Sequence, residues 1–115
     1  MPLRAVAAVR YALRGIGFMF AERNCRVLAG ATLAVIAAGA YFRLAALEWC
    51  ALIGATTLVW VAEGLNTALE RLTDLVSPGY HPLAGKAKDI AAGAVFVAVL
   101  GAVSIGIVIF GPRLL

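Results

Sequence analysis

The sequence predicts an all-α membrane protein with three transmembrane helices and an amphipathic surface helix at its amino terminus. Hydrophobic residues make up 63% of the 115 residues and charged residues 14%, whereas soluble globular domains have about 45–50% and about 25%. Three apolar stretches follow one another, and each approaches the length of about 17–25 residues that a membrane span needs. A chain of this length has no room for a separate soluble domain, so we expect a single membrane-embedded domain over residues 1–115.

Residues 1–26 are predicted to form a helix that lies on the membrane surface. Arginines interrupt short apolar runs in this segment, and the first three of them fall within an arc of about 120° on a helix. A signal peptide is the competing interpretation, but no uninterrupted apolar region precedes a cleavage site. The arginines are Arg4, Arg10, Arg14, Arg23 and Arg26.

Residues 27–115 are predicted to form a bundle of three spans, with apolar stretches at residues 27–42, 44–62 and 90–110. The last stretch contains no charge, whereas the first is short and needs a further helical turn. The middle one reaches full length only if Glu48 and Glu63 lie near opposite membrane faces. Abundant Gly, Ala, Ser and Thr favour close helix packing in lipid.

A turn in SPGYHP, residues 77–82, separates the second and third spans, because its prolines and Gly79 end the preceding helix. We expect the third span to begin at about Asp89. Cys25 and Cys50 then lie at opposite membrane faces, so neither a disulfide nor a shared metal is expected.

Charge predicts the orientation in the membrane. The amino-terminal segment and the loop at residues 71–89 lie on one side and carry eight of the ten Lys and Arg residues. The positive-inside rule places that side in the cytoplasm and the carboxyl terminus outside, as in a multi-pass protein of the bacterial inner membrane. The net charge of +4 suits contact with anionic lipid head groups, and no nucleic-acid-binding module is present.

The segment EGLNTALERLTD, residues 63–74, carries the most unusual polar pattern. On a helix, Glu63, Asn66, Glu70 and Asp74 fall within one arc of about 80°. Stacked acids repel one another unless a cation compensates. A solvated helix face is the simplest interpretation, yet ionisable residues near membrane depth favour a functional site.

The composition of this cluster favours phosphoryl transfer. Carboxylates from two segments, Glu22 and Glu70, are suitable ligands for one Mg²⁺, which prefers hard oxygen ligands. Lys86 and Lys88 are suited to neutralise phosphates, and Glu63 to accept a proton from a hydroxyl. Metal, cation and base are the parts that phosphoryl transfer requires. No Walker or kinase glycine-rich loop is present.

Together, EGLNTALERLTD and YHPLAGKAKDIAAGAV resemble the signature of the small prokaryotic integral-membrane lipid kinases, which comprise diacylglycerol kinase and undecaprenol kinase. RYALRGIG at residues 10–17 and ERNCR at residues 22–26 support the resemblance. It implies a homotrimeric bundle with active sites shared between subunits. It also implies ATP- and Mg²⁺-dependent phosphorylation of a lipid hydroxyl at the cytoplasmic membrane face.

The resemblance implies a role for each matching residue. Glu63 corresponds to the catalytic base, and Glu22 and Glu70 correspond to the metal-binding carboxylates. The implied nucleotide contacts are Arg4, Tyr11, Glu22, Asn66, Glu70, Gly79, Tyr80, His81, Lys88 and Asp89. Gly15 and Glu22 stand one residue closer than the family pattern expects, which affects Arg4 and Tyr11 most.

Two questions stay open at the level of sequence. HPLA and KDIAAGAV resemble the undecaprenol kinases more than the diacylglycerol kinases, but the apolar residues of a lipid pocket do not encode chain identity. The alternatives to an enzyme are a small oligomeric proton-coupled transporter that uses Glu63, or a structural packing subunit. A transporter leaves the lysines and the Pro-Gly turn unexplained, and a packing subunit leaves the acidic stripe unexplained.

Overall fold

The computed structural model describes residues 2–115, with the side chains described from Leu3 onward. These residues form four helices: α1 (Pro2–Phe20), α2 (Arg23–Phe42), α3 (Ala46–Val76) and α4 (Pro82–Leu114). Helices α2, α3 and α4 are long and apolar enough to cross a membrane. The predicted class, an all-α protein with three spanning helices and an amino-terminal amphipathic helix, is confirmed.

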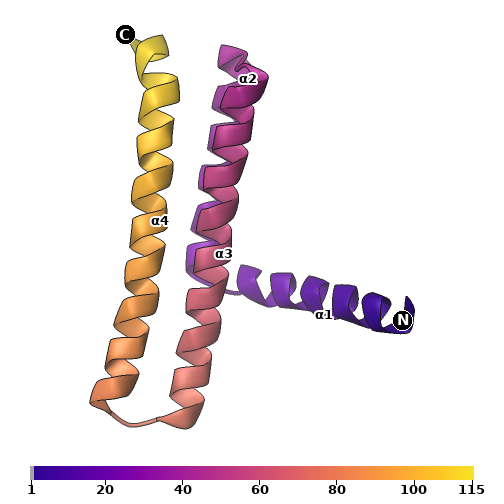
Figure 1. Cartoon of the computed structure of the whole chain (residues 1–115), viewed down its shortest axis with the longest axis vertical. Coiled ribbons are helices and arrows are strands. Elements are labelled where there is room, and N and C mark those ends of the chain that lie inside the picture. Colours follow the sequence, from indigo (N-terminus) through magenta and orange to yellow (C-terminus); the bar gives the residue numbers. More distant parts are fainter. Residues whose placement is uncertain (1) are drawn as a thin grey trace.

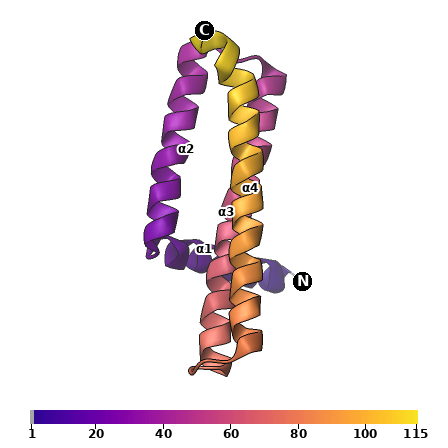
Figure 2. The same cartoon turned by 90° about the vertical axis from the view of Figure 1, so that its left-hand side faces the viewer.

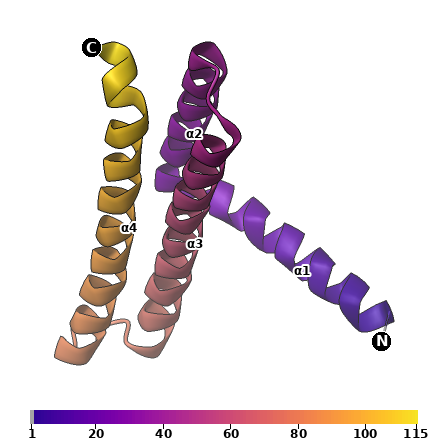
Figure 3. The same ribbon diagram turned by 45° about the horizontal axis from the view of Figure 1, so that its top comes forward.

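Helix α1 leaves the base of α2 at a steep angle and runs away from the other helices, with the amino terminus at its far end (Figures 1 and 3). It ends at Phe20, earlier than the predicted boundary at residue 26. A bend at Ala21 and Glu22 separates it from α2, so Arg23 and Arg26 belong to the first spanning helix. The Arg26 guanidinium donates to the carbonyl oxygens of Phe20 and Ala21 at 3.2 and 3.1 Å, which stabilises this corner.

Helices α3 and α4 form an antiparallel pair and make the most extensive contact in the chain (Figure 2). With 31 and 33 residues they measure about 46 and about 50 Å, whereas a bilayer hydrocarbon core is about 30 Å thick. The 20 residues of α2 are just long enough to span it. The hairpin of α3 and α4 therefore projects beyond the level of α1 (Figure 1).

Helix α4 begins seven residues before the predicted start at Asp89, because Pro82 is its first residue. Proline has the backbone angle that the first helical position needs and lacks an N–H that would remain unpaired there. His81 caps this end, since its Nδ1 accepts a hydrogen bond of 3.1 Å from the Leu83 backbone N–H. The predicted loop around Lys86 and Lys88 is therefore helical.

The opposite end of the hairpin is fastened by apolar packing and an ion pair. Leu44, Leu52 and Ile109 form a buried cluster there. The Arg113 guanidinium donates two hydrogen bonds of 2.8 Å to the Glu48 carboxylate and joins the end of α4 to the start of α3. Glu48 thus lies in the first turn of α3, about four turns before Glu63.

Most large apolar side chains are exposed. Phe96 is 63% and Val97 68% exposed on α4, and Tyr41 is 80% exposed on α2. Such a surface is stable in lipid, where hydrocarbon or the small-residue faces of other helices replace water. The exposure is consistent with a membrane-embedded chain.

Candidate functional site

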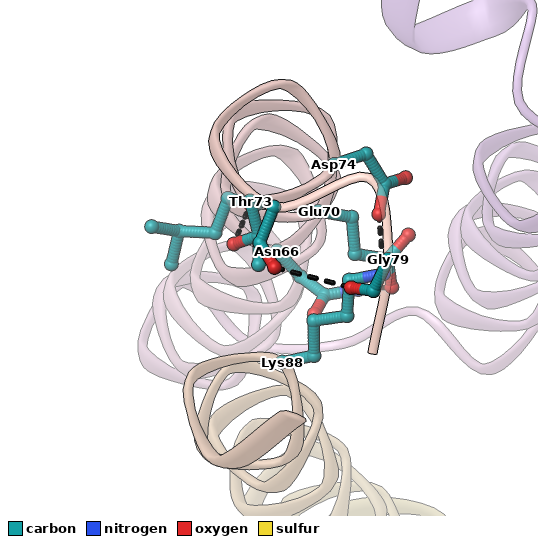
Figure 4. Close-up of polar contacts among 8 residues, drawn as sticks. Asn66, Glu70, Thr73, Asp74, Gly79 and Lys88 are labelled. Carbon is teal, nitrogen blue, oxygen red and sulfur yellow. Dashed lines mark hydrogen bonds and ion pairs between the residues drawn. The ribbon is translucent and has the colours of Figure 1, made fainter. Parts of the chain in front are cut away.

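The polar stripe lies on the second half of α3. Residues 63–74 are helical throughout, as predicted. Figure 4 shows Asn66, Glu70 and Asp74 on the side of α3 that faces the first turns of α4 and the turn at Gly79. The structure thus gathers on one side of α3 the residues that sequence spacing assigned to one arc.

Glu63 is the one buried charged side chain among residues 3–115, at 8% exposure. None of the ion pairs in this part of the chain involves it. An unpaired carboxylate in an apolar environment costs free energy, so a fold does not retain it for stability. Its burial favours the functional interpretation over a solvated helix face.

Asn66 and Glu70 form a polar pair one turn apart. The Asn66 Nδ2 donates a hydrogen bond of 3.3 Å to a Glu70 carboxylate oxygen (Figure 4). The Asn66 Oδ1 is buried and has no hydrogen-bond partner among the described residues. An unsatisfied buried acceptor is costly, and it suits a ligand that supplies a donor or a cation. Glu70 itself is exposed, so its carboxylate is accessible.

Glu22 reaches α3 through an ion pair with Arg71, which the sequence did not predict. Arg71 lies at about 80° from Glu63 around the helix, outside the acidic arc, so spacing gave no reason to single it out. The contact joins Glu22, at the corner between α1 and α2, to a side chain of α3. Glu22 is therefore tied to α3 through Arg71, the residue that follows Glu70 in the sequence.

The start of α4 contributes the positive charge. Lys88 forms an ion pair with Asp74, across the end of the hairpin (Figure 4). Asp89 is exposed on the same turns of α4, and Tyr80 is 93% exposed in the preceding loop. The Gly79 carbonyl accepts a hydrogen bond of 3.1 Å from the Ser77 hydroxyl. His81 has the local role of a helix cap, which the sequence analysis did not assign to it.

Arg4 and Tyr11 lie on α1 and are not brought to the stripe of the same chain. Both are exposed, and Arg4 is near the end of α1 that points away from α3 (Figure 1). The guanidinium carbons of Arg10 and Arg14 lie 6.0 and 5.8 Å from the centre of the Tyr11 ring. Within a single chain, therefore, these two predicted nucleotide contacts are separated from the others.

The described residues contain no ready cluster of three or more His, Cys, Asp or Glu ligands. The oxygen donors available here are the Glu70 carboxylate and the unpaired Asn66 Oδ1 on α3, and the Glu22 carboxylate held by Arg71. Mg²⁺ is usually held by only one or two carboxylates, with waters and substrate phosphates completing its shell. The donor set therefore suits a Mg²⁺ that arrives with a nucleotide rather than one caged by the protein alone.

An apolar groove of about 900 Å³ lies between α1 and α3, and sequence reasoning missed it. The groove is centred about 100° around α3 from Glu63, so it borders the polar stripe. The groove depends on the corner between α1 and α2, which brings Met19 and Phe20 at the end of α1 against Gly64 and Trp60 of α3. Its lining residues are Ala12, Gly15, Ile16, Phe18, Met19, Phe20, Trp60, Val61, Gly64, Leu65, Thr67, Ala68 and Arg71.

Comparison with known proteins decides the family. The sequence model of the family described as "Prokaryotic diacylglycerol kinase" matches residues 10–110, which is most of the chain. The chain belongs to the prokaryotic diacylglycerol kinase family. The predicted resemblance is confirmed, and so is the predicted enzyme class, lipid kinase, since the curated relatives carry lipid kinase names. Nothing in these names favours the alternative of a proton-coupled transporter.

Three relatives illustrate the range of this family. The chain is 42% identical to a "Diacylglycerol kinase" of Synechocystis over 112 residues, which cover 96% of this chain and 64% of that protein. It is 41% identical to "Undecaprenol kinase" of Bacillus subtilis over 93 residues, covering 81% and 76%. It is 31% identical to "Diacylglycerol kinase" of Escherichia coli strain K12 over 101 residues, covering 87% and 83%. This chain thus spans about two thirds of the Synechocystis relative.

Membership of the prokaryotic diacylglycerol kinase family and three apolar helices identify a multi-pass bacterial membrane protein. The two most similar of the three relatives carry different acceptor names at nearly equal identity. Sequence similarity therefore leaves the choice between diacylglycerol and undecaprenol open.

Proposed function

We propose that this chain transfers the γ-phosphate of MgATP to the hydroxyl of a membrane lipid, at the cytoplasmic face of the bacterial inner membrane. The observation that carries the proposal is the buried, unpaired Glu63 carboxylate on the helix that also lines the apolar groove. A lipid chain fits the groove, and its hydroxyl would reach the adjoining polar stripe.

Glu63 is the proposed general base. It would accept the proton of the lipid hydroxyl while the hydroxyl oxygen forms a bond to the γ-phosphorus and the bond to the leaving ADP oxygen breaks. A base is suited to this task when its carboxylate is partly desolvated and lies where the hydroxyl enters. The groove and the stripe meet along the side of α3 that carries Trp60 and Thr67, within one turn of Glu63.

Glu70 and Glu22 are the proposed metal ligands, with Asn66 Oδ1 as a further oxygen donor. Mg²⁺ would neutralise charge on the phosphates during transfer. Glu70 is already oriented by Asn66, whereas Glu22 must turn from Arg71 towards the metal. Before the Glu22 side chain makes this movement, its ion pair with Arg71 keeps it beside α3.

The remaining residues are proposed to hold the nucleotide. Lys88 is a cation on the same face as Glu70, and the turn before α4 presents polar groups next to it. Arg4 and Tyr11 would contribute from α1, which requires a partner subunit because they lie away from their own stripe. The full proposed nucleotide set is Arg4, Tyr11, Glu22, Asn66, Glu70, Gly79, Tyr80, His81, Lys88 and Asp89.

The orientation follows from charge. With α1, the hairpin end and the polar stripe on the cytoplasmic side, eight of the ten Lys and Arg residues lie there. The Glu48–Arg113 pair and the carboxyl terminus would lie outside. ATP is available only in the cytoplasm, so the proposed orientation and the proposed activity agree.

An assay of the purified protein in mixed micelles tests the function. We expect transfer of radiolabel from γ-labelled ATP to diacylglycerol, undecaprenol or both, dependent on Mg²⁺. The same micelles without acceptor lipid provide the control for ATP hydrolysis. Absence of transfer to either lipid by folded protein would refute the proposal, and the ratio of the two rates would identify the preferred acceptor.

We further propose a homotrimer with sites shared between chains. Each chain has three spans and one surface helix, and α1 projects away from the stripe of its own chain (Figure 3). Small residues on α3 and α4, such as Ala51, Gly54 and Gly93, would allow other subunits to approach closely.

Mixing two inactive variants tests the shared site. We expect Glu63→Gln and Arg4→Ala to be inactive alone and partly active after subunit exchange in detergent, because some sites would then combine an intact base with an intact α1. Activity is measured before and after mixing, and exchange is verified with differently tagged subunits. Full activity of a monomer, or no recovery after proven exchange, would contradict the shared site.

A further inference from the structure

We propose that Trp60 sets the length of lipid chain that the groove accepts, which makes it a specificity-determining residue for the acceptor. The inference rests on the proposed lipid kinase activity and assigns a new role within that site. A single bulky side chain would allow a pocket to discriminate between acceptor lipids, although its other apolar residues do not encode chain identity.

Trp60 is the wall between two cavities. The groove between α1 and α3 is lined on α3 by residues 60–71. A second cavity of about 220 Å³ lies between α2 and α3 and is lined on α3 by residues 49–60. Trp60 is the residue common to both linings, so the two spaces follow one another along α3 and its indole lies at their junction.

The indole is held in this position from two sides. Its Nε1 donates a hydrogen bond of 3.0 Å to the Thr32 Oγ1 on α2. The Thr32 hydroxyl donates its own proton to the Leu28 carbonyl at 2.8 Å, so it is oriented to accept from the indole. The ring of Phe20, the last residue of α1, lies 5.7 Å from the Trp60 ring centre. Three helices thus fix one side chain.

A lipid chain that runs along α3 from the groove towards the second cavity meets this side chain at the junction. Transfer from membrane hydrocarbon to an apolar pocket gives the chain little hydrophobic gain, because both surroundings are equally apolar. Discrimination must therefore be steric. Displacing the indole breaks its hydrogen bond to Thr32 in an apolar environment, and a loss of this kind corresponds to about a tenfold change in rate or affinity.

The first test compares acceptors of different length. For Trp60→Ala we expect the ratio of kcat/KM for dioleoylglycerol to that for dioctanoylglycerol to rise about tenfold over wild type, at unchanged KM for ATP. Trp60→Phe, which restores most of the ring, should return the ratio towards the wild-type value. Thr32→Val keeps the indole but removes its acceptor, and a smaller rise is expected.

Two variants serve as matched controls. Val61→Ala enlarges the groove without opening it onto the second cavity, and Ile53→Ala enlarges the second cavity without removing the wall. Neither should change the chain-length ratio by more than about twofold. An unchanged ratio in folded, active Trp60→Ala would overturn the inference, as would an equal rise in Val61→Ala.

A binding measurement is independent of turnover. In Trp49→Phe, Trp60 is the remaining tryptophan, and its fluorescence reports on a nearby bromine. Diacylglycerol brominated near the chain end should quench it more than brominated phosphatidylcholine at the same mole fraction. Equal quenching would overturn the inference. If the wild type phosphorylates no lipid, the proposed function fails, and the quenching alone decides whether a lipid chain reaches Trp60.

Discussion

Replacing Glu63 with glutamine is expected to lower phosphoryl transfer by about 10²–10⁴-fold, which is the usual contribution of a general base. Glutamine preserves the size of the side chain and removes its basicity. The rate of transfer to the preferred lipid, measured at saturating MgATP, checks the prediction. Binding of MgATP should persist, because the Glu63 carboxylate is not among the proposed metal ligands.

The same substitution is expected to leave stability unchanged or to raise it. Glu63 is 8% exposed, and no ion pair among the described residues compensates its charge. A neutral amide costs less to bury than an unpaired carboxylate. Thermal unfolding in the same detergent separates this outcome from misfolding. Near-normal turnover in the variant would exclude Glu63 as the base. Glu48→Gln, in the first turn of α3 where Glu48 pairs with Arg113, controls for loss of a carboxylate far from the site.

Loss of either proposed metal carboxylate is expected to raise the Mg²⁺ concentration needed for half-maximal activity by roughly ten- to a hundredfold. Unit charges about 4 Å apart interact by about 1–4 kcal/mol at effective dielectric constants between those of a protein surface and water. The variants are Glu70→Gln and Glu22→Gln, assayed over a Mg²⁺ titration at fixed ATP. A calorimetric titration with a non-hydrolysable MgATP analogue measures the binding directly.

Arg71→Gln provides the control that isolates the role of Glu22. It removes the same ion pair as Glu22→Gln but leaves the carboxylate in place. If Glu22 binds metal, only the loss of the carboxylate raises the Mg²⁺ requirement. Equal effects of both variants would mean that Glu22 acts by holding the corner of α1 and α2 against α3. Wild-type Mg²⁺ dependence in Glu70→Gln would remove Glu70 from the ligand set.

The sequence alone determined the class of the protein and the register of its polar stripe. Apolar composition and span length predict a membrane bundle because a continuous apolar stretch of about 20 residues can cross hydrocarbon as a helix, whose backbone groups are paired internally. Helical periodicity then placed Glu63, Asn66 and Glu70 on one face, since residues three and four positions apart share a side of any helix. Such local rules act within one segment and need no knowledge of the others. These rules placed the start of the third span at about Asp89, whereas α4 begins at Pro82. They treated Pro82 as a residue that breaks helices, although proline is also favoured at the first helical position.

Tertiary structure decided which distant segments meet. The pairing of Glu22 with Arg71, the burial of Glu63 and the junction of Trp60 with Thr32 and Phe20 all depend on how α1 and α2 pack against α3. No periodicity encodes these contacts, because they join side chains from separate helices whose relative angle is set at the bend around Ala21. The same angle carries Arg4 away from its own stripe (Figure 1). Sequence spacing fixes directions around one helix axis, whereas a site built from several helices also requires the distances between the axes, and packing alone supplies them.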